Sequence, residues 1–130
     1  MAKILGYREM LKTLVEYHIT FIERLAGEGY EPVFSILLLP WRGDEERLRE
    51  GVLPLLRQSD RLFYIDDNII ALLPGADWNG AMTVRRTIAD ALGIQLPAAD
   101  EDRECIVEYP TDGTQAFELI GNLYARCEEG

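Results

Sequence analysis

Apolar residues recur through the first part of the chain with alternating steps of three and four residues. This spacing predicts one long helix over residues 4–26, ended by Gly27 and Gly29. The same steps form a heptad repeat, so two interpretations stay open. The helix either covers a sheet with its apolar side or pairs with a second copy in a dimer. The candidate dimer seam consists of Leu11, Leu14, His18 and Phe21.

An unbroken apolar run over residues 33–39 lies between Pro32 and Pro40. Its length and its flanking prolines predict a buried central strand. Asp44 can then cap a helix that extends to about Ser59. Pro54 should kink this helix, because proline lacks the N–H that a helix interior needs. The apolar positions expected to face inward are Leu48, Val52, Leu55 and Leu56.

Two short apolar runs, 62–65 and 69–73, flank the turn-forming residues Asp66, Asp67 and Asn68 and predict a β-hairpin. The rest of the chain reads as a helix, a strand and a helix. The helix is capped by Asp77 or Asn79 and stopped by Gly93, the strand covers 104–109, and the last helix covers 115–127 after Thr114. Residues 97–103 are expected to form a polar loop.

The predicted order, α-β-α-β-β-α-β-α, favours an α+β fold with a mostly antiparallel, ferredoxin-like sheet covered by helices. At 130 residues, 48% of them hydrophobic, the chain is expected to form one domain over 1–130 with a buried core. The long helix over 4–26 precedes a core over 33–127.

The charge of the chain narrows the classes of partner. With 13 basic and 23 acidic residues the formal net charge is −10, which disfavours general nucleic-acid binding and docking on anionic membranes. No apolar stretch has the length of a membrane span, and no leader is recognised, so a cytoplasmic location is expected. Cys105 and Cys127 are expected to be reduced thiols, since two cysteines form neither a disulfide framework nor a zinc site.

Two segments in fixed order resemble the GGDEF (diguanylate cyclase) family. In that family a helix ends in Arg-x-x-Asp, a hairpin carries Gly-Gly-Asp-Glu-Phe at its turn, and the second strand ends in Leu-Pro. Here these elements correspond to Arg57 to Asp60, the hairpin turn, and Leu73-Pro74. The family's later Tyr-Pro-x-Asp-Gly corresponds to residues 109–113. The resemblance implies the family's ferredoxin-like core for residues 33–127.

The residues that carry catalysis in the family are replaced. Ile65 and Asp66 stand in the places of the two glycines, and Asn68 stands in the place of the glutamate. Pro40 stands where the family has a metal-binding aspartate at the end of the first strand. Catalysis in the family depends on bound metal ions and on a hairpin backbone that comes close to the nucleotide. Because the residues for both are replaced, the comparison with the family implies a protein that is not an enzyme and has no metal or other cofactor. Asp66 and Asp67 look like a metal pair, but a plain turn is the favoured reading.

Arg57-x-x-Asp60 resembles the family's inhibitory product site, where a fork-shaped donor beside an acceptor binds cyclic di-GMP. Arg61, at the start of the hairpin, is a further candidate contact. The spacing departs from the family, which has five residues between this aspartate and the first glycine where the present chain has four. A helix-end ion pair explains Arg57 and Asp60 equally well. Arg85 and Arg86 are interpreted as solvated charges of a helix.

Three functions follow as hypotheses. The first is a catalytically inactive signalling module that acts through a protein partner or a homodimer. The second is a cyclic di-GMP receptor that uses Arg57 and Asp60. The third, an active nucleotide cyclase, is retained only because the fold allows it.

Overall fold

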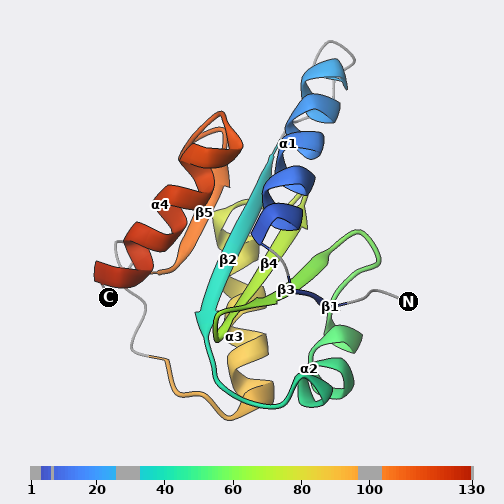
Figure 1. Ribbon diagram of the computed structural model, residues 1–130, viewed down its shortest axis with the longest axis vertical. Helices are drawn as coiled ribbons and strands as arrows, with labels where there is room; N and C mark the ends of the chain where they lie inside the picture. Colours follow the sequence, from blue (N-terminus) through green and yellow to red (C-terminus); the bar gives the residue numbers. More distant parts are fainter. Residues whose placement is uncertain (1–3, 7, 26–32, 97–103, 130) are drawn as a thin grey trace.

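The computed structural model describes residues 4–6, 8–25, 33–96 and 104–129, which form a five-stranded sheet with helices on both faces (Figure 1). In chain order the elements are β1 (Ile4–Leu5), α1 (Arg8–Leu25), β2 (Phe34–Pro40), α2 (Glu45–Gly51), the 3-10 turn η2 (Leu53–Leu55), β3 (Arg61–Ile65), β4 (Asn68–Pro74), α3 (Trp78–Leu92), β5 (Ile106–Tyr109) and α4 (Ala116–Glu129). The strand order is β1-β3-β4-β2-β5. All neighbouring strands are antiparallel except β1 and β3. This confirms the predicted α+β class.

The alternation of side chains along β2 divides the core into two layers. Phe34, Ile36 and Leu38 pack with α1 and α4 on one face of the sheet. Leu37 and Leu39 pack with α2 and α3 on the other face. Because both faces are covered, β2 is apolar on both sides, apart from the buried Ser35, whose hydroxyl donates to the Ala76 carbonyl at 2.8 Å. This is why the sequence identifies the strand as buried.

The first helix is shorter than predicted, because it begins at Arg8 rather than at residue 4. Ile4 and Leu5 are extended and pair in parallel with Leu62 and Phe63. Two extended residues beside β3 satisfy backbone groups that would otherwise line an open sheet edge. The predicted stop at Gly27 and Gly29 lies outside the described residues.

The second helix is also shorter than predicted. It starts at the Asp44 cap as expected but ends at Gly51, and a 3-10 turn follows over Leu53–Leu55. Pro54 cannot donate a helical hydrogen bond, and its ring disfavours the α conformation in the preceding residue, so the helix breaks where a kink was predicted. As a result Leu55 points outward and is 49% exposed.

The local signals of α3 are confirmed. The Asp77 side chain accepts a hydrogen bond from the Gly80 N–H at 2.8 Å, which caps the first turn. Gly93 ends the helix in the left-handed region, with φ of 72°. Among the described residues no helix combines the length and apolar character that crossing a bilayer requires.

The two cysteines form a disulfide, so the expectation of reduced thiols is wrong. The chain returns from β5 through α4 in the opposite direction, and this brings Cys127 in the last turn of the helix over Cys105, just before the strand. Their Cα atoms lie 5.0 Å apart. A sequence with two cysteines does not contain this proximity, because it arises only from the packing of α4 on β5.

The outer edge of β5 is closed by the side chains that follow it. Asp112 accepts a hydrogen bond from the Glu108 N–H at 2.8 Å and returns one from its own N–H to the Glu108 carbonyl. Arg126 donates to the Ile106 carbonyl and to the Asp112 carboxylate. Backbone groups that face away from the sheet along this strand are therefore already bonded within the chain.

Candidate functional site

The hairpin between β3 and β4 places the predicted turn next to the end of β2. Ile65 pairs with Asn68, so Asp66 and Asp67 alone form the turn. Their φ angles of 50° and 59° define the turn typical of a tight hairpin, which asparagine, aspartate and glycine adopt most readily. Asn68 lies opposite Pro40, so the proline that replaces the family's aspartate does sit beside the turn.

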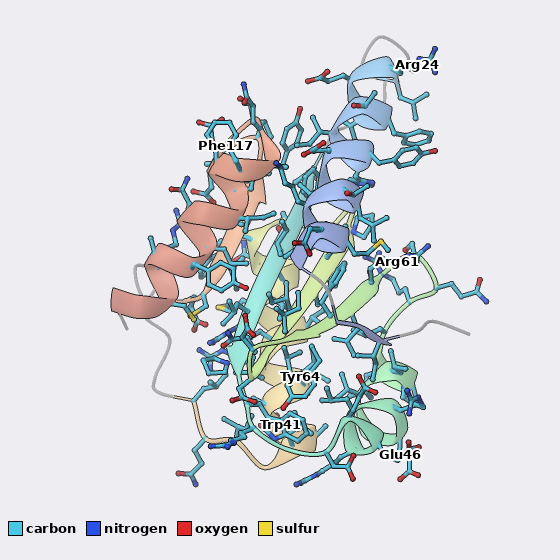
Figure 2. All side chains as sticks on the ribbon, in the orientation of Figure 1. Arg24, Trp41, Glu46, Arg61, Tyr64 and Phe117 are labelled. Carbon is cyan, nitrogen blue, oxygen red and sulfur yellow. A yellow bond between two sulfur atoms is a disulfide. The ribbon has the colours of Figure 1, made fainter. Side chains whose placement is uncertain are left out.

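An aromatic pair lies between the end of β2, the hairpin and the start of α2. The rings of Trp41 and Tyr64 are 5.6 Å apart between centroids, and Figure 2 shows the two side chains next to each other, to the left of α2. The Tyr64 hydroxyl accepts a hydrogen bond from the Gly43 N–H at 3.2 Å, and the Trp41 N–H donates to the Asp67 carbonyl at 3.1 Å. A Cβ atom at Gly43 would overlap the Trp41 ring, so only glycine permits this packing. The pair, defined here as the Trp41–Tyr64 plug, fixes the loop against the hairpin.

The side chains around the hairpin turn do not fit a site for two catalytic metal ions. Asp66 and Asp67 are exposed, and the neighbouring strand ends in a proline. Within the described residues, no three histidine, cysteine, aspartate or glutamate side chains are grouped so that they could hold a metal ion. A divalent ion needs several oxygen ligands from the protein or its substrate, and this turn offers two solvated carboxylates.

Arg57 and Asp60 lie together, and most of their hydrogen bonds join them to each other. Asp60 is 2% exposed and accepts hydrogen bonds from the Arg57 backbone N–H at 2.8 Å and from its guanidinium at 3.0 Å. The same guanidinium donates to the Pro74 carbonyl at 2.8 Å, which ties this corner to the end of β4. Arg61 donates to the carbonyls of Gln58 and Asp60 and lies near the start of the hairpin (Figure 2). The arrangement is the ion pair that the sequence offered as an alternative.

A shallow cavity of about 620 Å³ opens beside the exposed face of Arg57. It is lined by Val33, Arg57, Gly75, Ala76, Asp77, Gly80, Val84 and Glu108. The two carboxylates are engaged with the start of α3, since Asp77 binds the Gly80 N–H and Glu108 accepts from the Trp78 N–H at 2.7 Å. A phosphate in this cavity would meet one guanidinium and two carboxylates, which weakens its attraction.

Arg85 and Arg86 are not solvated helix charges, contrary to the prediction. Arg85 is 7% exposed and donates to the Leu38 carbonyl at 2.9 Å and to Glu104 at 2.8 Å. Arg86 donates to the other oxygen of Glu104 at 2.7 Å. Burial lowers the pKa of Arg85, and the adjacent Glu104 carboxylate opposes that effect. The three side chains join α3 to β2 and to the start of β5, so their role is structural.

His18 lies between α1 and the sheet, on the core side of the helix. Its ring meets Phe34 edge-on, with centroids 4.9 Å apart, and its Nε2 atom is buried with no hydrogen-bond partner among the described residues. Burial lowers the pKa of His18, because the charged imidazolium would lose its hydration there. The position favours a neutral histidine.

The pKa of His18 predicts a pH dependence of stability. Since the unfolded chain takes up the proton more readily, the free energy of unfolding should fall as pH drops below about 6.5, the ordinary value for histidine. His18→Phe keeps a ring against Phe34 and removes both the titration and the unpaired nitrogen. We expect this variant to be more stable by about 1 kcal/mol at neutral pH and to lose less stability toward pH 5.5. Thermal unfolding of both proteins across this range measures the difference, and parallel curves would contradict the assignment.

The predicted dimer seam does not form one surface. Leu11 is fully buried in the core and His18 faces Phe34, whereas Leu14 is partly buried and only Phe21 is well exposed. The helix begins at Arg8, so the heptad register read from residue 4 includes core positions. The dimer itself stays a prediction, but these four residues do not together offer a surface for it.

Several residues that shape these sites give weak signals in sequence. Tyr64 lies in a strand of ordinary composition and shows no motif. Glu104 borders a polar stretch. Arg85, however, falls on the apolar line of α3 with Ala81, Ile88 and Leu92, all of them buried, and a basic residue on such a line indicates a buried charge with a partner.

The comparisons with known proteins concern the fold. No protein-family model matches the sequence, and no curated protein matches it either. Among solved structures, the GGDEF domain of TpbB (also called YfiN) from Pseudomonas aeruginosa superposes with a TM-score of 0.66 over 98% of this chain and 86% of that chain. The sequence identity is 15%, so the likeness concerns the fold. The chain therefore has the fold of a GGDEF-like domain.

Proposed function

We propose that this protein is a non-catalytic GGDEF-like module that acts in bacterial signalling by binding another protein or itself. The observation that carries the proposal is the Trp41–Tyr64 plug. It lies beside the hairpin turn, where the family's resemblance implies that nucleotide and metal ions meet. Asp66 and Asp67 point to solvent there, and Pro40 cannot bind a metal. Without glycines at the hairpin turn, the backbone there cannot come as close to a nucleotide as phosphoryl transfer in this family requires.

The acidic surface supports the same conclusion. With a net charge of −10, the chain repels a triphosphate unless metal ions or local arginines offset the repulsion. The exposed Arg42 follows Trp41, beyond the end of β2. The Phe-Lys and Asn-Asp-x-x-Gly-His elements, with which the GGDEF family helps to hold GTP after this strand, do not occur in the sequence. A helical surface for a partner is a simpler use of this fold.

The test of the first proposal is nucleotide turnover. We expect no cyclic di-GMP from GTP with Mg²⁺ or Mn²⁺, at protein concentrations where an active GGDEF domain converts its substrate completely. Trp41→Ala is tested beside it. Removing the indole ring opens space next to the hairpin turn, but it should not give activity if the metal-binding side chains are also missing. Turnover by the unmodified protein would disprove the proposal.

A second candidate, a cyclic di-GMP receptor, is favoured by the cavity at Arg57. That side chain is 59% exposed and borders the cavity, although Asp60 is covered by it. A guanine base could face Asp77 and Glu108 rather than Asp60, with Arg57 on its acceptor edge. On this proposal the binding of cyclic di-GMP depends directly on Arg57 and only indirectly on Asp60.

Calorimetric titration with cyclic di-GMP, with GTP as a control, separates the two candidates. On the first proposal neither nucleotide releases heat. On the second, saturable micromolar binding is lost in Arg57→Ala and retained in Arg49→Ala, whose exposed guanidinium pairs with Glu46 on α2. Because Arg57 also neutralises buried Asp60, the melting temperature of each variant must be measured without ligand, so that a loss of binding is not mistaken for a loss of fold.

A further inference from the structure

The helix α1 carries three lengthwise strips, and one of them is largely exposed among the described residues. The first strip packs on the sheet through Leu11, Val15 and Ile22. The second is acidic and repeats every seven residues, at Glu9, Glu16 and Glu23, and its last two members line a groove beside α4. The third, here named the outer strip, consists of Met10, Leu14, Tyr17 and Phe21.

The outer strip is apolar yet exposed. Met10 is 41% exposed, Tyr17 is 70% exposed and Phe21 is 47% exposed, while Leu14 at its margin packs partly against the core. These three are among five large apolar side chains that the described residues leave exposed. Single exposed apolar residues are ordinary, whereas an aligned set on one helix indicates a contact surface.

The spacing of the outer strip is that of a helix pair. Steps of four, three and four residues from Met10 to Phe21 place the side chains within about 60° of one another around the helix, over a rise of about 16 Å. A second helix with the same spacing can interdigitate with such a line. The strip is therefore self-complementary in shape, as a two-fold interface requires.

The charges beside the strip select the partner and its direction. The chain carries 23 acidic residues, but none lies on the outer strip, so pairing two strips brings no carboxylates face to face within the contact. The next residue along this side is Arg24, seven positions after Tyr17, at the end of α1 (Figure 2). Two parallel helices would bring the two Arg24 side chains together. Two antiparallel helices crossing near Tyr17 bring each Arg24 to Met10 of the partner copy and beside its Glu9, which is favourable.

We propose that two copies of this protein associate through the outer strip, with their α1 helices antiparallel and a two-fold axis near Tyr17. The inference rests on the proposed function, because it names the copy itself as the partner that a non-catalytic module binds. The proposed contact uses the outer strip in place of the dimer seam predicted from the sequence, which lies on a neighbouring side of the same helix. Met10 and Tyr17 enter the contact, and Leu11 and His18 remain in the core.

Sedimentation velocity over the micromolar range tests the proposal. We expect a concentration-dependent dimer whose dissociation constant rises at least about a hundredfold in Tyr17→Glu, since two charges would be buried without partners. Phe117→Glu is the matched control: Phe117 is 64% exposed, lies on α4 and should leave the dissociation constant unchanged. Both variants should keep the wild-type melting temperature at low concentration, because each replaced side chain is exposed.

Cross-linking tests the direction of the helices. Mixing Met10→Cys with Arg24→Cys should give a disulfide-linked pair under mild oxidation, whereas Met10→Cys alone should not. Cross-linking of Met10→Cys to itself would overturn the antiparallel arrangement. A wild type that stays monomeric throughout, or a dimer that Tyr17→Glu leaves intact, would overturn the proposal itself. Either result, together with absent GTP turnover, leaves the proposed loss of catalysis standing, so the two failures are distinguishable.

Discussion

Replacing Glu104 with alanine is expected to lower the free energy of unfolding by about 3–5 kcal/mol, the range for breaking a buried ion pair from one side. Glu104 is 5% exposed and accepts from Arg85 at 2.8 Å and from Arg86 at 2.7 Å. Without it, Arg85 stays buried with only the Leu38 carbonyl to offset its charge. An uncompensated buried cation costs much more than a missing contact between neutral groups.

Urea unfolding measures this effect, and two further variants assign it. Glu46→Ala removes one of the two exposed carboxylates that pair with Arg49, so it should cost less than about 1 kcal/mol. The double variant Arg85→Met with Glu104→Leu removes the buried cation together with its counter-ion and should recover most of the stability, because apolar groups of similar volume replace the pair. If Glu104→Ala were as mild as Glu46→Ala, the buried cluster would not be formed in solution.

Reduction of the disulfide is expected to lower stability by about 3 kcal/mol. The cross-link joins Cys105 to Cys127 across a sequence separation of 22 residues, and a loop of that size restricts the unfolded chain by about this amount. The effect should appear as a lower melting temperature when a dithiol reductant is present.

The variant Cys105→Ala with Cys127→Ala provides the control. Its melting temperature should match that of the reduced protein to within a few degrees and should not respond to the reductant. Mass spectrometry after alkylation shows whether the purified protein holds free thiols. A wild type that alkylates fully without reduction, or that melts identically with and without reductant, would contradict the cross-link.

The parts of the fold that the sequence predicts well are those decided by neighbouring residues. The hairpin follows from two turn residues that tolerate positive φ, and α3 follows from a capping aspartate and a terminating glycine. Each signal lies within a few residues of the structure that it determines. The buried strand β2 is equally plain, because a sheet covered on both faces leaves no polar alternation along it.

The parts that the sequence does not predict depend on distant partners. Ile4 and Leu5 continue the helical spacing of α1, yet they are extended because the edge of β3 lies beside them. The cysteines meet because α4 packs back over β5. At the candidate ligand site, the sequence gives Arg57 and Asp60 at a spacing of three residues, but in the structure the Asp60 carboxylate is bonded to Arg57 itself. A motif gives residue types at a spacing, and only the packing decides whether they face a ligand or each other.

The closed outer edge of β5 has a consequence for how the protein behaves when crowded. Strand-by-strand growth, as in domain-swapped chains and fibrils, needs free N–H and C=O groups in a row. Along β5 the Ile106 carbonyl accepts from Arg126 and the Ile106 N–H donates to the Glu104 carbonyl. The Glu108 N–H donates to the Asp112 carboxylate, and the Glu108 carbonyl accepts from the Asp112 N–H. At this edge the protein can therefore sit close to its copies without templating their sheets, and encounters there stay reversible.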